Sequence, residues 1–155
     1  MGGAIAANLR RAGYEVWGFD PSAAAAAQAQ THGIWTVESI DDLPTENALI
    51  LTSLRSGASL QQTVEALARR PSASCVVAEL STLSLQDKEL ARSALASVAI
   101  ELLDAPISGA GAQAIEADLS VYVSGTREAW EACPGSLRLS QADRATSALS
   151  GPERA

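Results

Sequence analysis

The first twenty residues, MGGAIAANLRRAGYEVWGFD, combine a glycine-opened helix, a strand and a terminal acid. Apolar residues at helical spacing and a closing glycine, Gly13, predict a short helix over residues 2–12. Tyr14 to Phe19 is aromatic, β-branched and almost continuously apolar, which predicts a parallel strand covered on both faces. This strand runs directly into Asp20. The order is typical of the second half of a βαβ unit, so it restricts the chain to architectures built on a parallel sheet.

The glycine at the helix start and the acid after the strand have a specific meaning in such a unit. In dinucleotide-binding sheets the helix start, here Gly2, faces a pyrophosphate, and the acid, here Asp20, accepts hydrogen bonds from the ribose hydroxyls. A carboxylate favours NAD because it repels the 2′-phosphate of NADP, although one acid does not exclude NADP. The alternative is an ordinary capped helix before a buried strand. Because Met1 directly precedes Gly2, we also expect the first strand and the first two glycines of the fingerprint to be missing.

The rest of the chain alternates between strand-like and helical segments. Further strands are predicted at Ile34–Val37, Ala48–Leu54, Cys75–Leu80, Ala99–Leu103 and Leu119–Val123. Helical patterns cover residues 23–30 and 60–70, a helical turn starts at Ser39, and another helix follows the N-cap Ser84. Strands separated by about ten to fifteen helical residues form crossover units. We therefore predict an α/β, Rossmann-type fold with a mostly parallel sheet and helices on both faces, in one domain over residues 1–133.

Ligands of such sheets bind at the carboxyl ends of the strands, which makes the residues after each strand the candidates for binding. These residues are Asp20, Leu54 with Arg55, Ser81 with Thr82, and the segment from Asp104 to Gly109. Hydroxyl and backbone N–H groups at helix starts suit a ribose, a phosphate or a substrate carboxylate. The alternative is that the serines at positions 81, 84 and 108 act only as helix N-caps.

Composition excludes several classes of partner. The net charge of -7 and the absence of a basic run argue against nucleic acid and against anionic membrane surfaces, and 47% apolar residues supply a globular core. No apolar run has the length of a membrane span, no signal peptide is recognisable, and we expect a cytoplasmic protein. Cys75 and Cys133 lack metal-ligand spacing, so no metal site is predicted. His32, beside Gly33, is expected to complement a helix end rather than to act in catalysis. The sequence makes no prediction of the oligomeric state.

The run DAPISGAGAQA, residues 104–114, is the most specific motif in the chain. It resembles the substrate-side signature Asp-Ala-Pro-Val-Ser-Gly-Gly-x-x-Gly-Ala of the β-hydroxyacid dehydrogenase family, which includes 3-hydroxyisobutyrate dehydrogenases and, more distantly, 6-phosphogluconate dehydrogenase. In that family a strand ending in Gly-Leu-Gly-x-Met-Gly precedes Ala-x-Asn-Leu. The last part of this pattern is matched by Met1, Gly2, Ala6, Asn8 and Leu9. The resemblance covers residues 1–133.

The resemblance implies a role for most of the candidate residues. The cofactor, NAD or NADP, would be bound by Gly2, Asp20, Leu54, Ser81 and Thr82. The Ser-Thr pair lies near the nicotinamide in the family. The substrate would be a small 3-hydroxy acid, with its carboxylate held by the backbone of Ser108 and Gly109. In the intact family NAD takes a hydride from the hydroxyl-bearing carbon while a lysine accepts the hydroxyl proton.

The chain departs from the family at several glycines and at one proline. Ala110, Gln113 and Ala117 stand where the family has glycine. Each added Cβ fills space and is expected to remove access to positive φ, which would hinder close approach of the backbone to a substrate. The family's Leu-Pro after the fourth strand is Leu54-Arg55 here. The arginine either contacts a phosphate or is a solvated loop charge.

No residue is assigned to catalysis. The family's lysine lies on a helix that leads to an all-helical second domain, whereas the single lysine of this chain, Lys88, lies between Asp87 and Glu89. We expect it on a helix with a surface pattern, in local charge pairing. Residues 134–155 are expected to form an irregular polar tail, and the helical catalytic domain to be absent. The chain alone is thus expected not to catalyse hydride transfer.

Two other interpretations remain. The chain could be a non-enzymatic nucleotide-binding or interaction module, or the product of a degraded gene, since loss of a central strand leaves buried sheet edges unpaired. A methyltransferase-like Rossmann domain shares the acid at the strand end but does not explain residues 104–114.

Overall fold

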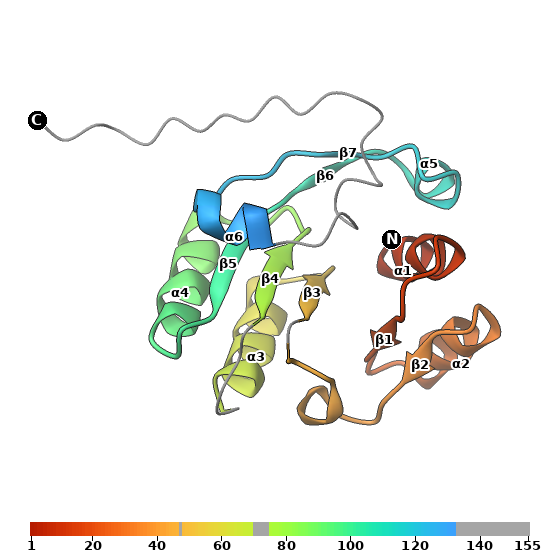
Figure 1. Ribbon diagram of the computed structural model, residues 1–155, viewed down its shortest axis with the longest axis horizontal. Helices are drawn as coiled ribbons and strands as arrows, with labels where there is room; N and C mark the ends of the chain where they lie inside the picture. Colours follow the sequence, from red (N-terminus) through yellow and green to blue (C-terminus); the bar gives the residue numbers. More distant parts are fainter. Residues whose placement is uncertain (47, 70–74, 133–155) are drawn as a thin grey trace, which may run out of the picture.

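The computed structural model describes residues 1–46, 48–69 and 75–132. Its helices are α1 (Gly2–Arg11), α2 (Ala23–Thr31), α3 (Gly57–Ala68), α4 (Leu85–Ala96), α5 (Gly111–Ile115) and α6 (Arg127–Ala132), with a 3-10 turn, η1 (Ile40–Asp42). Its strands are β1 (Trp17–Gly18), β2 (Trp35–Thr36), β3 (Leu49–Thr52), β4 (Val76–Glu79), β5 (Glu101–Asp104), β6 (Ile107–Ser108) and β7 (Ser120–Val121) (Figure 1). The alternation of strands and helices confirms the predicted α/β class.

The strands form three separate hydrogen-bonded ladders. The parallel ladder β3-β4-β5 is the largest, β1 pairs with β2 in parallel, and β6 pairs with β7 in antiparallel fashion. The prediction of a mostly parallel arrangement is confirmed for β1 to β5. It is wrong for β7, which was expected to continue the series. The connection from β6 through the five-residue helix α5 is too short for a crossover, so the chain turns back on itself there.

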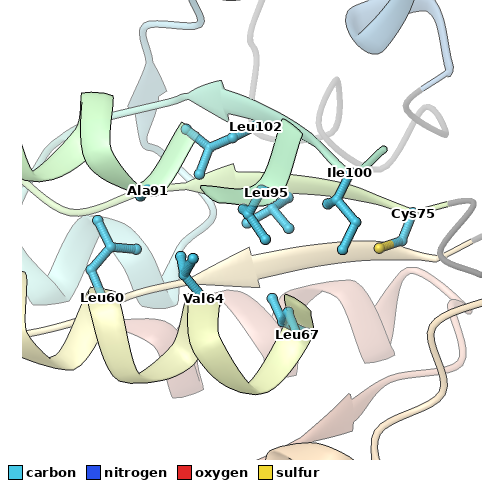
Figure 2. Close-up of a cluster of buried hydrophobic side chains, with 9 residues drawn as sticks. Leu60, Val64, Leu67, Cys75, Ala91, Leu95, Ile100 and Leu102 are labelled. Atoms are coloured by element: carbon cyan, nitrogen blue, oxygen red, sulfur yellow. The ribbon is translucent and has the colours of Figure 1, made fainter. Parts of the chain in front are cut away.

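The two faces of the β3-β4-β5 ladder are buried against different elements, because successive side chains of a strand point to opposite sides. Val77 and Leu102 lie in an apolar cluster with side chains of α3 and α4 (Figure 2). Their neighbours Ala78 and Leu103 lie in a second cluster that includes Ala129 of α6. Helices therefore cover both faces, as the near-continuous apolar runs predict. Of the described helices, none is long and apolar enough to cross a membrane.

Serine hydroxyls begin three of the helices. The Oγ atoms of Ser22, Ser56 and Ser84 accept hydrogen bonds from backbone N–H groups in the first turns of α2, α3 and α4. Ser39 caps η1 in the same way, as predicted, and His32 occupies the C-cap position of α2. These caps fix where each helix starts after the strand before it, and thus where the loops at the strand ends lie.

The first ladder differs from its prediction. The apolar run from Tyr14 to Phe19 forms only the two-residue strand β1, and its aromatic side chains are not covered on both faces. Trp17 is 40% exposed and Trp35 is 57% exposed, and their rings stack with centroids 5.8 Å apart. Trp17 pairs with Trp35 across the ladder, so the two indoles shield one another where the described elements provide no other cover.

Two alanines adopt the left-handed conformation. Ala99 and Ala117 both have φ of 60°. The expectation that alanine at position 117 removes access to positive φ is therefore wrong. Its backbone adopts the left-handed conformation despite a steric cost of about 1 to 2 kcal/mol. Hydrogen bonds hold the turn, including one from Asp118 N to Gln113 O of 2.8 Å.

Replacing Ala117 with glycine should therefore stabilise the chain. We expect Ala117→Gly to raise the free energy of unfolding by about 1 kcal/mol, because glycine takes this φ without a Cβ clash. Urea denaturation followed by circular dichroism measures the effect. Ala112→Gly, in the right-handed turn of α5, is the matched control and should lower the same free energy by about 0.5 to 1 kcal/mol. Equal effects at both positions would contradict the assignment of strain to position 117.

Cys133 and the predicted tail at residues 134–155 lie outside the described residues. Cys75 is buried at the edge of the first apolar cluster, in agreement with a packing role.

Candidate functional site

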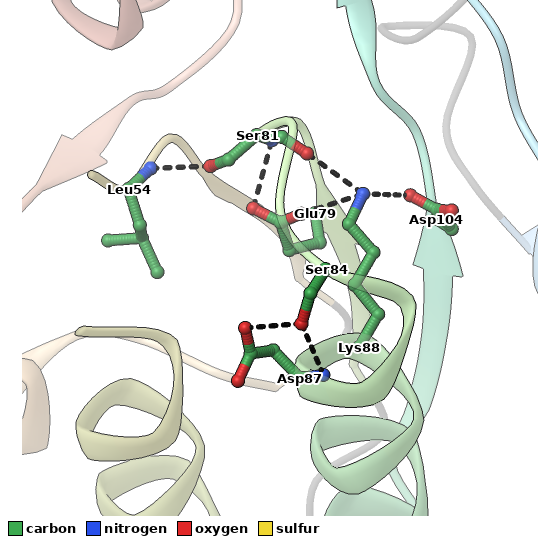
Figure 3. Close-up of polar contacts among 7 residues, drawn as sticks. All are labelled: Leu54, Glu79, Ser81, Ser84, Asp87, Lys88 and Asp104. Carbon is green, nitrogen blue, oxygen red and sulfur yellow. Dashed lines mark hydrogen bonds and ion pairs between the residues drawn. The ribbon is translucent and has the colours of Figure 1, made fainter. Parts of the chain in front are cut away.

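The loops after β3 and β4 are joined at their start by the side chain of Ser81. Leu54 N donates to Ser81 Oγ at 2.6 Å, and Ser81 N donates to Glu79 Oε1 at 2.9 Å (Figure 3). Two of the predicted cofactor-binding residues, Leu54 and Ser81, are thus in direct contact. Since Ser81 Oγ accepts the bond from Leu54, its own proton remains available for a ligand.

Lys88 occupies the centre of this group, and its predicted surface position is wrong. Its side chain is 8% exposed, and Nζ donates to Ser81 O at 2.8 Å. Nζ also lies 3.2 Å from Oε2 of Glu79 and forms an ion pair with the Asp104 carboxylate. The interactions are therefore not with its sequence neighbours Asp87 and Glu89. Asp87 instead bonds to Ser84, whose Oγ donates to Asp87 Oδ2 at 2.6 Å.

The buried position of Lys88 follows from the face of α4 on which it lies. Lys88, Ala91 and Leu95 are spaced at three and four residues, and all three are buried. Ala91 and Leu95 pack into the apolar cluster, which places Lys88 one turn earlier, at the carboxyl ends of β4 and β5. The i, i+3, i+7 pattern is visible in the sequence, but a lysine in such a pattern is more typical of a solvated face.

Glu79 was missed as a residue of the site. Its side chain is fully buried, on the same side of β4 as Val77. Oε2 receives no hydrogen bond of good geometry from the described residues, so its contact with Nζ at 3.2 Å is mainly electrostatic. Strand alternation alone could have placed this acid inside, and a buried acid requires a cation nearby. The single lysine of the chain was the obvious partner.

The start of α1 lies beside the same loop. A Cβ added to Gly2 would lie 3.2 Å from Ser53 Cβ, so the absence of a side chain allows the helix start to approach the residue before Leu54. α1 also lacks the side-chain cap that α2, α3 and α4 have. Its first N–H groups are thus suited to an anion such as a pyrophosphate. The structure in this way brings Gly2 together with Leu54 and Ser81.

The other two predicted cofactor residues are not bonded to this group. Asp20 follows β1, and its Oδ1 accepts a hydrogen bond of 2.8 Å from Ser22 N, at the start of α2. This bond orients the carboxylate at the carboxyl end of β1, where a ribose would lie in a dinucleotide-binding sheet. Thr82 is exposed directly after Ser81.

The predicted substrate segment forms β6 and the turn into α5. Ser108 is exposed in β6. Gly109 has φ of +144°, and a Cβ there would lie 2.6 Å from Leu119 Cδ2, so this position requires glycine. Gln113 replaces a family glycine and gains a role, because its Oε1 accepts a hydrogen bond of 2.8 Å from Ala110 N. The segment therefore keeps a defined turn despite its departures from the family pattern.

Asn8 connects this segment to α1. Its Nδ2 donates to Ala114 O at 2.6 Å, and Arg11 donates to Ile115 O at 2.9 Å. α5 consequently lies beside the helix that starts at Gly2, as Figure 1 also shows. Sequence reasoning used Asn8 only as a motif match and did not predict this contact. Among the described residues, no three acidic, histidine or cysteine side chains are grouped to hold a metal ion.

Comparison with known proteins agrees with this geometry. Residues 1–142 match the family model described as the NAD binding domain of 6-phosphogluconate dehydrogenase. A probable 3-hydroxyisobutyrate dehydrogenase of Mycobacterium bovis is 30% identical over 125 residues, which are 81% of this chain and 42% of the relative. The chain therefore spans less than half the length of this curated relative.

Solved structures show the same fold. The 3-hydroxyisobutyrate dehydrogenase of Mycobacterium tuberculosis, solved with L-serine, has a TM-score of 0.80 at 27% identity, over 90% of this chain and 48% of that one. Psf3, solved with NADP+ and 2-OPP, has a TM-score of 0.73 at 22% identity, over 90% of this chain and 50% of that one. The family model, the curated relative and the fold agree with the motifs of the sequence. The chain therefore belongs to the family of NAD binding domains of 6-phosphogluconate dehydrogenase, and it is similar to 3-hydroxyisobutyrate dehydrogenases over part of their length.

Proposed function

We propose that the chain binds NAD, or less tightly NADP, across the carboxyl ends of β1, β3 and β4. The observation that carries this proposal is the contact of Leu54 with Ser81, beside the uncapped start of α1 at Gly2. The helix start suits the pyrophosphate, and the Asp20 carboxylate suits the ribose hydroxyls. Ser81 and Thr82 supply hydroxyl donors for the remainder of the dinucleotide.

The substrate side of the proposal rests on β6 and α5. We propose that the backbone at Ser108 and Gly109 holds the carboxylate of a small 3-hydroxy acid. The exposed Ser108 and the glycine-dependent turn at Gly109 support this assignment, because backbone N–H groups can approach an anion only where no side chain intervenes. When bound, the nicotinamide would accept or donate the hydride.

We further propose that this chain alone does not complete the reaction. An acid–base group must lie within hydrogen-bond reach of the substrate hydroxyl. Lys88 does not fit that role, because its ammonium group is buried and directed to Ser81 O, Glu79 and Asp104. Proton transfer would then depend on a group outside the described residues.

A titration with NADH tests the binding proposal. Trp17 lies three residues before the proposed ribose ligand Asp20, and Trp35 stacks on it, so bound NADH should change tryptophan emission in a saturable way. A Trp17→Phe variant should lose most of that change while still binding the nucleotide, as judged by NADH fluorescence. The absence of saturable binding at millimolar NADH would overturn the proposal and favour a module without a nucleotide ligand.

A further inference from the structure

We infer that Lys88 is a positioning residue of the nucleotide site. Together with Glu79 it fixes the backbone of Ser81, and through Asp104 it joins the Ser81 turn to the segment that leads to Ser108. This inference rests on the proposed function, because Ser81 and Ser108 are proposed to contact cofactor and substrate. It assigns to the single lysine of the chain a role other than acid–base catalysis.

The ion pair of Lys88 and Glu79 holds both backbone groups of Ser81. Glu79 Oε1 accepts from Ser81 N at 2.9 Å, and Lys88 Nζ donates to Ser81 O at 2.8 Å (Figure 3). The backbone of this residue is thus held on both sides by charged partners, which form stronger hydrogen bonds than neutral ones. Its Oγ then stands where Leu54 N can reach it, at 2.6 Å. The position of the Ser81 hydroxyl group therefore depends on the ion pair of Lys88 and Glu79.

The second link runs to the neighbouring strand. Glu79 and Asp104 are register partners at the ends of β4 and β5, so two carboxylates lie side by side. Like charges directly opposite each other repel, and the ammonium group of Lys88 compensates for both. Three residues after Asp104 the chain reaches Ile107, where β6 begins. Lys88 therefore fixes the separation between the Ser81 turn and the segment proposed to hold substrate.

The arrangement is that of a positioning residue and not of a catalytic residue. An ammonium group has three N–H donors, and three oxygen-bearing partners surround Nζ of Lys88. The side chain is only 8% exposed. Nζ hydrogen-bonds Ser81 O and Asp104 and lies 3.2 Å from the Glu79 carboxylate, so Lys88 acts on a ligand through Ser81 and Asp104.

A double variant separates positioning from simple stabilisation. Lys88→Met with Glu79→Gln removes both charges of the buried pair, and the amide oxygen of the new side chain can still accept from Ser81 N. We expect its thermal midpoint to lie above that of Lys88→Met alone, because only the partly exposed Asp104 then lacks its cation. We expect the Kd of the double variant for NADH to be about tenfold higher than that of the unmodified chain, since one charge-assisted hydrogen bond to Ser81 is lost. Arg92→Met, on the exposed side of α4, is the matched control and should change neither quantity.

Amide hydrogen exchange supplies a readout that needs no ligand. Leu54 N–H is bonded to Ser81 Oγ, so its exchange rate reports whether Ser81 holds its position. The inference expects faster exchange at Leu54 in the double variant, with amides in β4 unchanged. A double variant with unaltered NADH affinity and unaltered Leu54 exchange would overturn it. If the unmodified chain binds no NADH, the proposed function fails. The amide exchange rate of Leu54 in the double variant then decides by itself whether Lys88 positions Ser81.

Discussion

Replacing Lys88 alone with methionine is expected to lower the free energy of unfolding by about 3 to 5 kcal/mol. The substitution leaves the Glu79 carboxylate, which is fully buried, without the cation 3.2 Å away. It also leaves the register partner Asp104 uncompensated. Breaking a buried ion pair from one side costs far more than removing both charges, because one charge then remains in a poorly solvating environment.

Urea denaturation followed by far-ultraviolet circular dichroism measures this loss. Arg127→Met removes an exposed cation that is paired with Glu131 in α6, and should leave the free energy of unfolding nearly unchanged, because water screens an exposed ion pair. Both variants remove one positive charge, so a difference between their free energies of unfolding reports the burial of Lys88. A loss below about 1 kcal/mol for Lys88→Met would mean that the lysine and Glu79 are solvated in solution, contrary to the structure.

The second large effect concerns the choice of nucleotide. Asp20→Asn should lower the preference for NADH over NADPH by about tenfold or more. The substitution weakens the hydrogen bonds to the ribose hydroxyls and removes the charge that repels a 2′-phosphate. Asparagine can still accept the hydrogen bond from Ser22 N, so the start of α2 should be retained. The two dissociation constants are compared at the same ionic strength, because the repulsion is screened by salt.

Asp42→Asn provides the control for a general change in surface charge. Asp42 is an exposed acid in η1, and it is not one of the proposed nucleotide ligands. The account predicts an unchanged ratio of the two dissociation constants for this variant. Equal shifts for Asp20→Asn and Asp42→Asn would show that net charge, and not a ribose ligand, sets the preference.

The sequence was sufficient for helices α1 to α4 and for strands β3, β4 and β5, but it did not predict β6, α5 or α6. Serine caps at positions 39 and 84 were recognisable because an N-cap acts within its own turn. The apolar runs of β3, β4 and β5 predicted buried strands with helices on both faces. In the structure an apolar cluster lies on each face of this ladder. The position of Leu54 and Ser81 at the same edge of the sheet was predicted from a general property of parallel sheets, whose strand ends meet there, whereas the contact between the two residues was not.

The errors arose where a residue's environment depends on distant segments. Trp17 was predicted to be covered because its strand is apolar, but cover depends on which elements pack on that face. Lys88 was placed on the surface because its sequence neighbours are acidic, whereas its partners come from β4 and β5. The left-handed Ala117 could not be inferred from propensity, because surrounding hydrogen bonds impose a conformation that alanine alone disfavours.

The measurement that tests the central claim most directly is an NMR titration of the nitrogen-15-labelled chain with NADH. The account predicts the largest amide shifts in the loops at the carboxyl ends of β1, β3 and β4 and at the start of α1, that is, at Gly2, Asp20, Leu54, Ser81 and Thr82. Amides on the far side of α3 and in η1 should not shift. Shifts confined to those distant elements, or none at millimolar NADH, would contradict the claim that this edge of the sheet is a dinucleotide site.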